Sequence, residues 1–287
     1  MADYTRFGPA GVPERFKKII GHISDVPDLL HAEGLTAFEY PAVRWGQKPQ
    51  IKKESAEQLK NQALRNDIVL SIHGSYFLNL CGKEEIVEAS KRRILACVQA
   101  AKWMNAYVVV FHPGFYGKMD KNAAQKKCVK ELREVVETMK SLGITEVKLG
   151  PETMGKVSQV GSLEEILTFC EEVEQTHLVI DWGHLHARQN GFFRESGDFR
   201  SIINNIEQRL GTKAVRNMHC HFSKIEYTKK GERRHHILDN KDYGPDFKLL
   251  SEVIVEYKMN PVIISETPLL DLDSINMRNM LNNMVNS

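Results

Sequence analysis

The sequence lacks the features of a secreted, membrane-spanning or strongly charged protein. Its five cysteines stand singly with no CxxC spacing, which argues against a zinc ribbon and favours reduced thiols over a disulfide framework. No apolar stretch is long enough to span a bilayer, and no apolar or arginine-rich leader is visible. A formal net charge of +2 is too small to demand a nucleic-acid partner by itself. We therefore expect an intracellular, cytoplasmic protein with no membrane partner.

The chain does contain a regular alternation of short apolar runs and helical patterns, with an ordinary 42% of hydrophobic residues. Such an alternation indicates parallel strands joined by right-handed crossovers, and eight strands favour closure into a barrel. We therefore predict an α/β fold, a (β/α)8 TIM barrel that forms a single domain over residues 1–287. The predicted strands are residues 6–11, 35–40, 67–73, 106–112, 146–152, 178–181, 215–221 and 262–266.

Six of the predicted strands end in a histidine or an acid. A buried strand gains nothing from a terminal charge unless that charge is paired or bound, and the carboxyl ends of barrel strands share one face. Histidine mixed with carboxylate suits zinc, manganese or ferrous iron. The candidates are His73, His112, Glu152, Asp181, His184, His219, His235, His236 and Glu266, with His186 and His221 as secondary ones. They are too many for one ion, so we expect two or three ions, with Glu152 as a bridging ligand.

The motifs that carry these residues resemble, in order and spacing, those of the endonuclease IV family of apurinic/apyrimidinic endonucleases. The resemblance covers nearly the whole of residues 35–267. It rests on the segments SIHGSYFLNL, VVFHPG, PETMGK, VIDWGHLHA, MHCHFSK, RRHHILD and VIISET. It implies a TIM barrel with three zinc ions, a hydrolase of DNA base-excision repair that cleaves damaged double-stranded DNA on the 5′ side of an abasic nucleotide.

The resemblance also implies a ligand set for each ion and a catalytic role for Glu152, which would share in two of the sets. The third ion would need an aspartate where this chain has Arg233, which cannot bind a cation. Either Glu232 moves in, or the third ion is weak or missing, or Arg233 contacts a phosphate. The implied sets are His73, His112 and Glu152; Glu152, Asp181, His219 and Glu266; and His184 with His235.

Loops on the same face offer candidate DNA contacts. A cation beside aromatic side chains fits a duplex that is opened and a base stack that is filled after a nucleotide is turned out. The alternative is that the aromatic rings pack beneath their own loops. The segment SKIEYTKKGERRHH is basic and could hold phosphates. The candidate DNA-binding residues are Arg44, Trp45, Tyr76, Phe77, Lys229, Lys230, Arg233 and Arg234.

Two other functions fit the same residues. A xylose-isomerase-like sugar isomerase or epimerase would use one divalent ion, held by Glu152, Asp181, His219 and Glu266, and would leave the other histidines without a role. A non-cleaving barrel that binds abasic DNA would use Arg233 for phosphate affinity. We expect a monomer with damaged double-stranded DNA as its partner.

Overall fold

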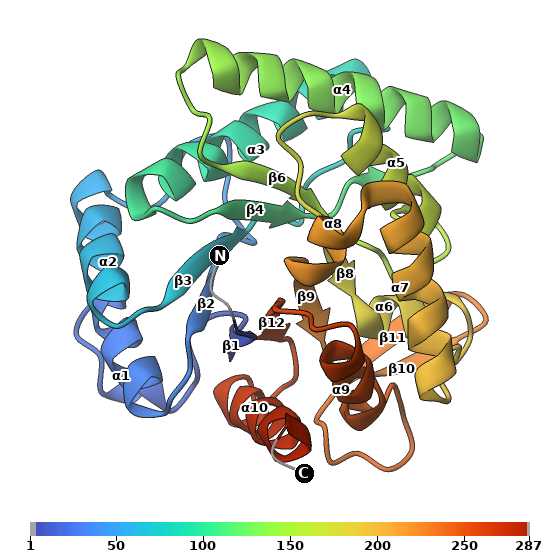
Figure 1. The fold of residues 1–287 in the computed structure, drawn as a ribbon. Helices are drawn as coiled ribbons and strands as arrows, with labels where there is room; N and C mark the ends of the chain where they lie inside the picture. Colours follow the sequence, from blue (N-terminus) through green and yellow to red (C-terminus); the bar gives the residue numbers. More distant parts are fainter. Residues whose placement is uncertain (1–3, 286–287) are drawn as a thin grey trace.

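Eight parallel strands enclose the centre of residues 4–285, the part of the chain that this computed structural model describes (Figure 1). They pair in two arcs, β2-β3-β4-β6 and β1-β12-β9-β8. Parallel bridges between Ala10 and Glu39 and between Glu152 and Val179 join the arcs. The predicted TIM barrel is therefore confirmed. The strands are β1 (Arg6–Pro9), β2 (Ala37–Pro41), β3 (Val69–His73), β4 (Val108–Phe111), β6 (Lys148–Pro151), β8 (Val179–Asp181), β9 (His219–Phe222) and β12 (Val262–Ser265).

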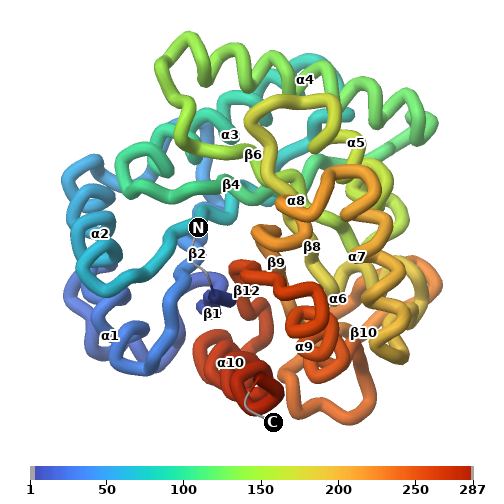
Figure 2. The backbone as a smooth tube through the Cα atoms, in the orientation of Figure 1, coloured from blue at the N-terminus to red at the C-terminus, as the bar shows by residue number. Residues whose placement is uncertain are grey.

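Helices cover the outside of the barrel, as the backbone trace in Figure 2 makes clear. Local sequence fixes where several of them begin. Ser162 starts α5, because its side chain accepts from the backbone N–H of Glu165 while the Glu165 carboxylate accepts from the Ser162 N–H. The helices are α1 (Val26–Ala32), α2 (Lys53–Arg65), α3 (Glu84–Met104), α4 (Lys121–Ser141), α5 (Leu163–Glu172), α6 (Trp182–Arg188), α7 (Ser196–Leu210), α8 (Thr212–Arg216), α9 (Phe247–Glu256) and α10 (Asp271–Val285), with short 3-10 turns at Phe16–Lys18 and Ile23–Asp25.

Successive residues of the strands face the helices and the barrel interior in turn. Phe38, Ile180 and Cys220 belong to the large outer core, so Cys220 packs away from its neighbouring histidines. Two small apolar clusters lie between the strands on the other side, one around Val262 and Ile264 and one around Val108, Val110 and Val179. Toward the carboxyl ends of the strands, the interior positions become polar.

Two glycines allow the strands to pack this closely. A Cβ atom on Gly8 would lie 1.8 Å from the carbonyl oxygen of Ala37, and one on Gly150 would lie 2.7 Å from a methyl group of Val179. Neither position can accept a side chain without displacing the neighbouring strand. Glycine at these two positions keeps the barrel narrow, so that groups from opposite strands reach each other.

Several local predictions were wrong. Residues 224–245 contain none of the predicted strands, but they form an antiparallel hairpin of β10 (Lys224–Thr228) and β11 (Gly231–His236). Residues 215–218 lie before β9 and not within it, and α6 and α10 were not predicted. A second pair of short strands, β5 (Gly114–Phe115) and β7 (Gln159–Val160), also forms beside the barrel. Local patterns failed here because hairpin pairing depends on partners that the sequence does not specify.

The described residues also bear on the state of the cysteines and on membrane-spanning helices. All five cysteines lie in the described region and are free thiols there. Between residues 4 and 285, no helix is both long and apolar enough to cross a membrane.

Candidate metal centre

Histidine and acidic side chains converge where the barrel strands end. His73 and Asp181 are the last residues of β3 and β8, and His112 and Glu152 directly follow β4 and β6. Asp181 is also the N-cap of α6, and its Oδ1 accepts a 2.6 Å hydrogen bond from the backbone N–H of His184. The spacing in DWGH therefore has a structural cause: the cap fixes the carboxylate and the first helical turn presents the imidazole beside it.

Three groups of ligand atoms form one continuous centre. Within each group, the ligand atoms lie within 4.8 Å of one another. Glu152 belongs to the first two groups, so they adjoin each other. The groups are His73, His112 and Glu152; Glu152, Asp181, His221 and Glu266; and His184, Glu232 and His235.

Glu152 lies at the middle of this centre and is completely buried. Its Oε2 atom is 3.1 Å from His112 Nε2 and 3.5 Å from His73 Nε2. Its Oε1 atom is 3.2 Å from both His184 Nδ1 and His221 Nδ1. Even so, neither Glu152 Oε2 nor Asp181 Oδ2 has an aligned hydrogen-bond donor within residues 4–285. Buried acceptors of this kind are costly unless something else satisfies them.

Hydrogen bonds to the backbone determine how two of the histidines face Glu152 and its neighbours. His73 Nδ1 lies 3.1 Å from the Gly74 carbonyl oxygen, and His184 Nδ1 lies 2.9 Å from that of Thr153. A carbonyl only accepts, so each Nδ1 carries the hydrogen. In the neutral ring Nε2 then presents a lone pair, in His73 to Glu152 and in His184 to Glu232 Oε2, 3.5 Å away. A lone pair facing a carboxylate needs a cation or a proton between them.

The pKa shifts also indicate that this centre favours positive charge. Burial lowers the pKa of His73, but its contacts with Glu152 and the nearby carboxylates outweigh burial and raise it to about 9. Burial likewise opposes charge on His184 and His221, yet the surrounding carboxylates hold the pKa of both well above 6.5. Burial opposes charge on Glu152 as well, but the histidines hold its pKa well below 4.5. The centre thus attracts positive charge strongly, and its unsatisfied acceptors and mixed N and O donors fit a cluster of divalent cations.

Of the two histidines on β9, the structure places His221, and not the expected His219, beside Glu152, Asp181 and Glu266. His219 lies two residues earlier on the same face of β9, with Nδ1 2.6 Å from the Tyr107 hydroxyl and Nε2 3.1 Å from Glu39 Oε2. Both of its ring nitrogens are therefore already engaged, below the level of the ligands. The remaining candidate ligands, His73, His112, Glu152, Asp181, His184, His235 and Glu266, all lie in the three groups.

Glu232, and not residue 233, places a carboxylate beside His184 and His235. The pairing of β10 with β11 shifts register: Glu226 pairs with Arg234 and Tyr227 with Glu232, so Arg233 is an extra residue in a β-bulge. Glu232 and His235 would face opposite sides of a regular strand, but the bulge turns both toward His184. Arg233 points outward, with 69% of its side chain exposed, and pairs with Glu226 at 2.6 Å.

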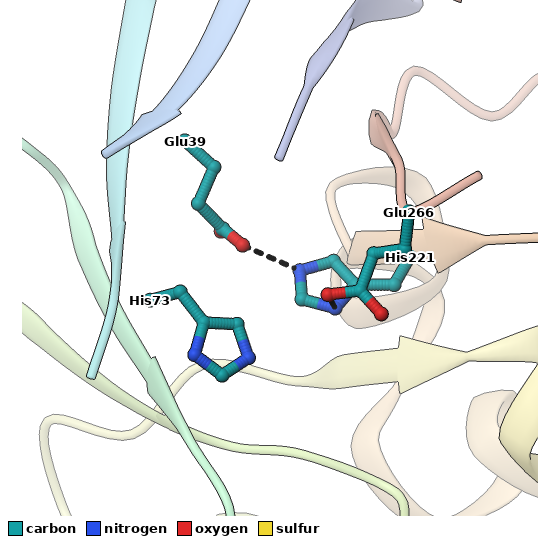
Figure 3. A group of neighbouring side chains, drawn as sticks. All are labelled: Glu39, His73, His221 and Glu266. Carbon is teal, nitrogen blue, oxygen red and sulfur yellow. Dashed lines mark ion pairs between the residues drawn. The ribbon is translucent and has the colours of Figure 1, made fainter. Parts of the chain in front are cut away.

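Two candidate histidines, the secondary candidate His186 and the primary candidate His236, lie outside the three groups and have structural contacts instead. His186 stacks on Phe193, with ring centroids 6.1 Å apart, and its Nδ1 accepts from the Phe193 backbone N–H. His236 stacks on Tyr243 and lies 3.4 Å from Glu226. Glu39 was missed in the sequence and lies next to His221 and His73 (Figure 3). The available signal was an acid one residue before the end of the apolar run LTAFEY.

The aromatic candidates divide into two kinds. Tyr76 and Phe77 are 54% and 62% exposed, and the Tyr76 ring stacks on His112 with centroids 5.5 Å apart. Trp45, by contrast, is only 6% exposed and packs against Tyr40 beneath its own loop, so the expectation that it contacts DNA does not fit its position. The basic candidates Arg44, Lys229, Lys230, Arg233 and Arg234 are all exposed.

Fold and site together define a TIM barrel with a multi-residue metal-ligand centre at the carboxyl ends of its strands. The chain belongs to the xylose isomerase-like TIM barrel family, whose model matches residues 27–274. An uncharacterized protein of Methanocaldococcus jannaschii is 32% identical over 276 residues, with 94% of both chains covered. A probable endonuclease 4 of Sulfurihydrogenibium is 26% identical, covering 67% of this chain and 69% of the relative.

Solved structures agree on the fold. Endonuclease IV from Thermus thermophilus superposes with a TM-score of 0.67 at 19% identity, covering 91% of this chain and 94% of its own. A D-tagatose 3-epimerase-like protein also superposes with a TM-score of 0.67, at 16% identity, covering 93% of this chain and 94% of its own. The architecture is therefore shared by proteins named for two different chemistries, and the choice between them depends on the site.

Proposed function

We propose that this protein is an endonuclease IV-like phosphodiesterase of DNA repair that uses zinc ions to cleave DNA on the 5′ side of abasic nucleotides. The observation that carries the proposal is the set of three adjoining ligand groups. A one-ion enzyme needs only the group around His221, and would leave His73, His112 and His184 buried against carboxylates without a purpose. Relatives named as probable endonuclease 4 support the same choice.

Each group of residues has a separate task in this reaction. When bound, divalent ions supply a hydroxide nucleophile near neutral pH and stabilise charge on the leaving oxygen. Glu152 would hold two ions at a fixed separation, because its two oxygens face different histidines. Asp181 is held by its cap to α6, so its free oxygen stays directed at the same place. No protein nucleophile is required.

The surroundings of the centre suit an opened duplex. The exposed ring of Tyr76 stands directly above His112, where a turned-out sugar would expose a gap in the base stack. Phe77 lies beside it and is also exposed. Lys229 and Lys230 form the turn of the hairpin that carries Glu232 and His235, so phosphate contacts and ligands share one element.

The test combines metal analysis with an incision assay. The purified protein is analysed for bound elements, then offered a labelled duplex with one tetrahydrofuran abasic site, and a matched undamaged duplex, before and after treatment with a chelator. We expect two or three ions per chain, a single cut 5′ to the lesion, loss of cutting with the chelator, and recovery with Zn²⁺. Manganese or iron at the same sites would leave the mechanism unchanged.

A sugar epimerase is the second candidate, because Glu152, Asp181, His221 and Glu266 alone could hold one ion. One ion per chain, with epimerisation of a ketohexose and no incision, would establish it. A third outcome, salt-sensitive binding of the abasic duplex without any cut, would identify a non-cleaving DNA-binding barrel.

A further inference from the structure

A buried carboxylate lies behind the metal centre, deeper in the barrel than the three ligand groups. Glu39 is on β2 and is 0% exposed. Figure 3 shows its carboxylate directed at the His221 ring. An ionised carboxylate in such a place is tolerated only when donors or cations surround it.

Two donors and one further ring nitrogen surround Glu39. Its Oε2 atom accepts from the Ser71 hydroxyl at 2.8 Å and from His219 Nε2 at 3.1 Å. Its Oε1 atom lies 3.0 Å from His221 Nε2, which in turn lies 3.3 Å from His219 Nε2. Among the described residues, Oε1 has no aligned hydrogen-bond donor, so it is free to accept one.

The Tyr107 hydroxyl determines where the hydrogens lie on His219 and around Glu39. The Tyr107 hydroxyl lies 2.6 Å from His219 Nδ1, and burial keeps that hydroxyl protonated, with a pKa well above 10. Tyr107 therefore donates, His219 Nδ1 accepts, and the hydrogen of His219 sits on Nε2, facing Glu39. Oε2 then accepts from two donors. When an ion occupies His221 Nδ1, the hydrogen of His221 must lie on Nε2, and Glu39 Oε1, 3.0 Å away, is the acceptor that has no other donor among the described residues.

A hydrogen on His221 Nε2 leaves the other ring nitrogen free. His221 Nδ1 lies 3.2 Å from Glu152 Oε1 and 3.3 Å from Glu266 Oε1, inside the second ligand group. Metal-binding histidines usually donate their second ring N–H to a carboxylate, which fixes both the tautomer and the ring orientation. The chain Tyr107, His219, Glu39, His221 has that arrangement.

We propose that Glu39 is a positioning residue, oriented by His219, that holds His221 with Nδ1 directed at an ion bound by Glu152, Asp181 and Glu266. This inference rests on the metal centre of the proposed function, but not on DNA as the substrate. Its rival is that Glu39 binds an ion itself, because Glu39, His73, His221 and Glu266 also offer ligand atoms within 4.8 Å of one another.

Glu39→Gln separates the two roles. Glutamine has one acceptor oxygen and adds an N–H group, so it cannot accept from Ser71, His219 and His221 together. We expect the number of bound Zn²⁺ ions to stay the same while the affinity for one of them falls by about 10- to 100-fold. Competition with a chromophoric chelator gives the affinity, and elemental analysis gives the number. Glu266→Gln, which removes a proposed ligand, is the comparison and should lose one ion.

A second readout reports the tautomer directly. In the zinc-loaded protein, long-range ¹H–¹⁵N correlation spectra should show His221 protonated on Nε2, and Glu39→Gln should weaken or mix that state. Glu39→Asp keeps the charge and should restore part of the affinity. If Glu39→Gln is poorly folded, Tyr107→Phe removes only the outermost donor and should lower the affinity a few-fold.

The outcomes separate this inference from the proposed function. A wild-type protein that binds no more than one ion would contradict the multi-metal enzyme. A wild-type protein with two or three ions whose Glu39→Gln variant loses a whole ion would show that Glu39 is a ligand. Unchanged affinity and an unchanged His221 tautomer in Glu39→Gln would overturn the positioning role while leaving the enzyme intact.

Discussion

The two ends of the barrel bury the same kinds of side chain in opposite ways. At the amino-terminal end, the Arg6 guanidinium donates to the Asp67 backbone oxygen at 2.7 Å and to its carboxylate at 2.8 Å. At the carboxyl-terminal end, Glu152 and Asp181 each keep an oxygen without an aligned donor within the described chain, although histidines surround both. At the amino-terminal end, the nitrogen atoms Arg6 Nε and His177 Nε2 are left without a partner in the described chain, whereas at the carboxyl-terminal end carboxylate oxygens are left, which a cation would satisfy.

Removing the central carboxylate should have the largest effect on activity. Glu152→Gln should lower incision by at least about 10²–10³-fold, the order of loss seen when one group that stabilises a transition state is removed. It should also reduce the number of bound ions, because two ligand groups share this residue. Single-turnover cleavage of the abasic duplex and elemental analysis measure the two effects.

The matched control is Glu131→Gln. Glu131 is 3% exposed, lies on α4 and is outside the three ligand groups. It clusters with Glu88 and Glu134, but the Lys91 ammonium pairs with all three carboxylates and supplies their positive charge. Its substitution should leave metal content and cleavage intact. Retained turnover in a folded Glu152→Gln variant would remove Glu152 from the mechanism.

The bulge in the hairpin allows a sharper test of how the centre is completed. Glu232→Gln should lower the affinity for one ion by at least about 10- to 100-fold, since losing even an outer-shell partner costs that much. Arg233→Gln should leave the metal content unchanged, because the Arg233 side chain points outward and pairs with Glu226. Chelator competition measures both variants.

Arg233→Asp tests whether residue 233 can face the third ligand group. If it can, an aspartate at 233 would raise the affinity for the third ion. The register given by the pairs Glu226 with Arg234 and Tyr227 with Glu232 keeps residue 233 on the outside, so no gain is expected. A clear gain in metal affinity would show that the hairpin can change its register.

The fold and the face that carries the candidate ligands could be predicted from the sequence, because each follows from a single pattern. The alternation of strand and helix patterns predicted the barrel, and apolar runs that end in histidine or acid predicted the face on which Glu152 and Asp181 lie. The prediction of ligands failed where the depth of a residue in the barrel, or the register of a hairpin, determines its position. His219 and His221 share one face of β9, and only the packing against Tyr107 and Glu39 places His219 below the centre. Glu232 likewise required a bulge, which depends on the partner strand.

At the amino-terminal end, His177 should have a small effect on the pH dependence of the free energy of unfolding. Burial, with a smaller contribution from His219, lowers the pKa of His177 from 6.5 to about 3. Its Nε2 atom is buried and has no hydrogen-bond partner in residues 4–285, and its ring packs edge-on against Tyr107. The unfolded chain therefore takes up a proton below pH 6.5 that the folded chain refuses.

The sign follows from this difference in proton uptake. The stability that neutral His177 contributes is fully present above pH 6.5 and is lost as the pH falls from 6.5 toward 3, by at most about 1.4 kcal/mol per pH unit. His73 in the metal-free protein has the opposite sign: its pKa is raised to about 9, so its contribution is present below pH 6.5 and is lost as the pH rises through 9. Urea unfolding of the metal-free protein from pH 4.5 to 7 should show a shallower slope for His177→Gln than for the wild type. The exposed His31→Gln serves as the control and should leave the slope unchanged. Equal slopes in all three proteins would mean that His177 accepts a proton without unfolding, and that the amino-terminal end tolerates positive charge as readily as the carboxyl-terminal end attracts it.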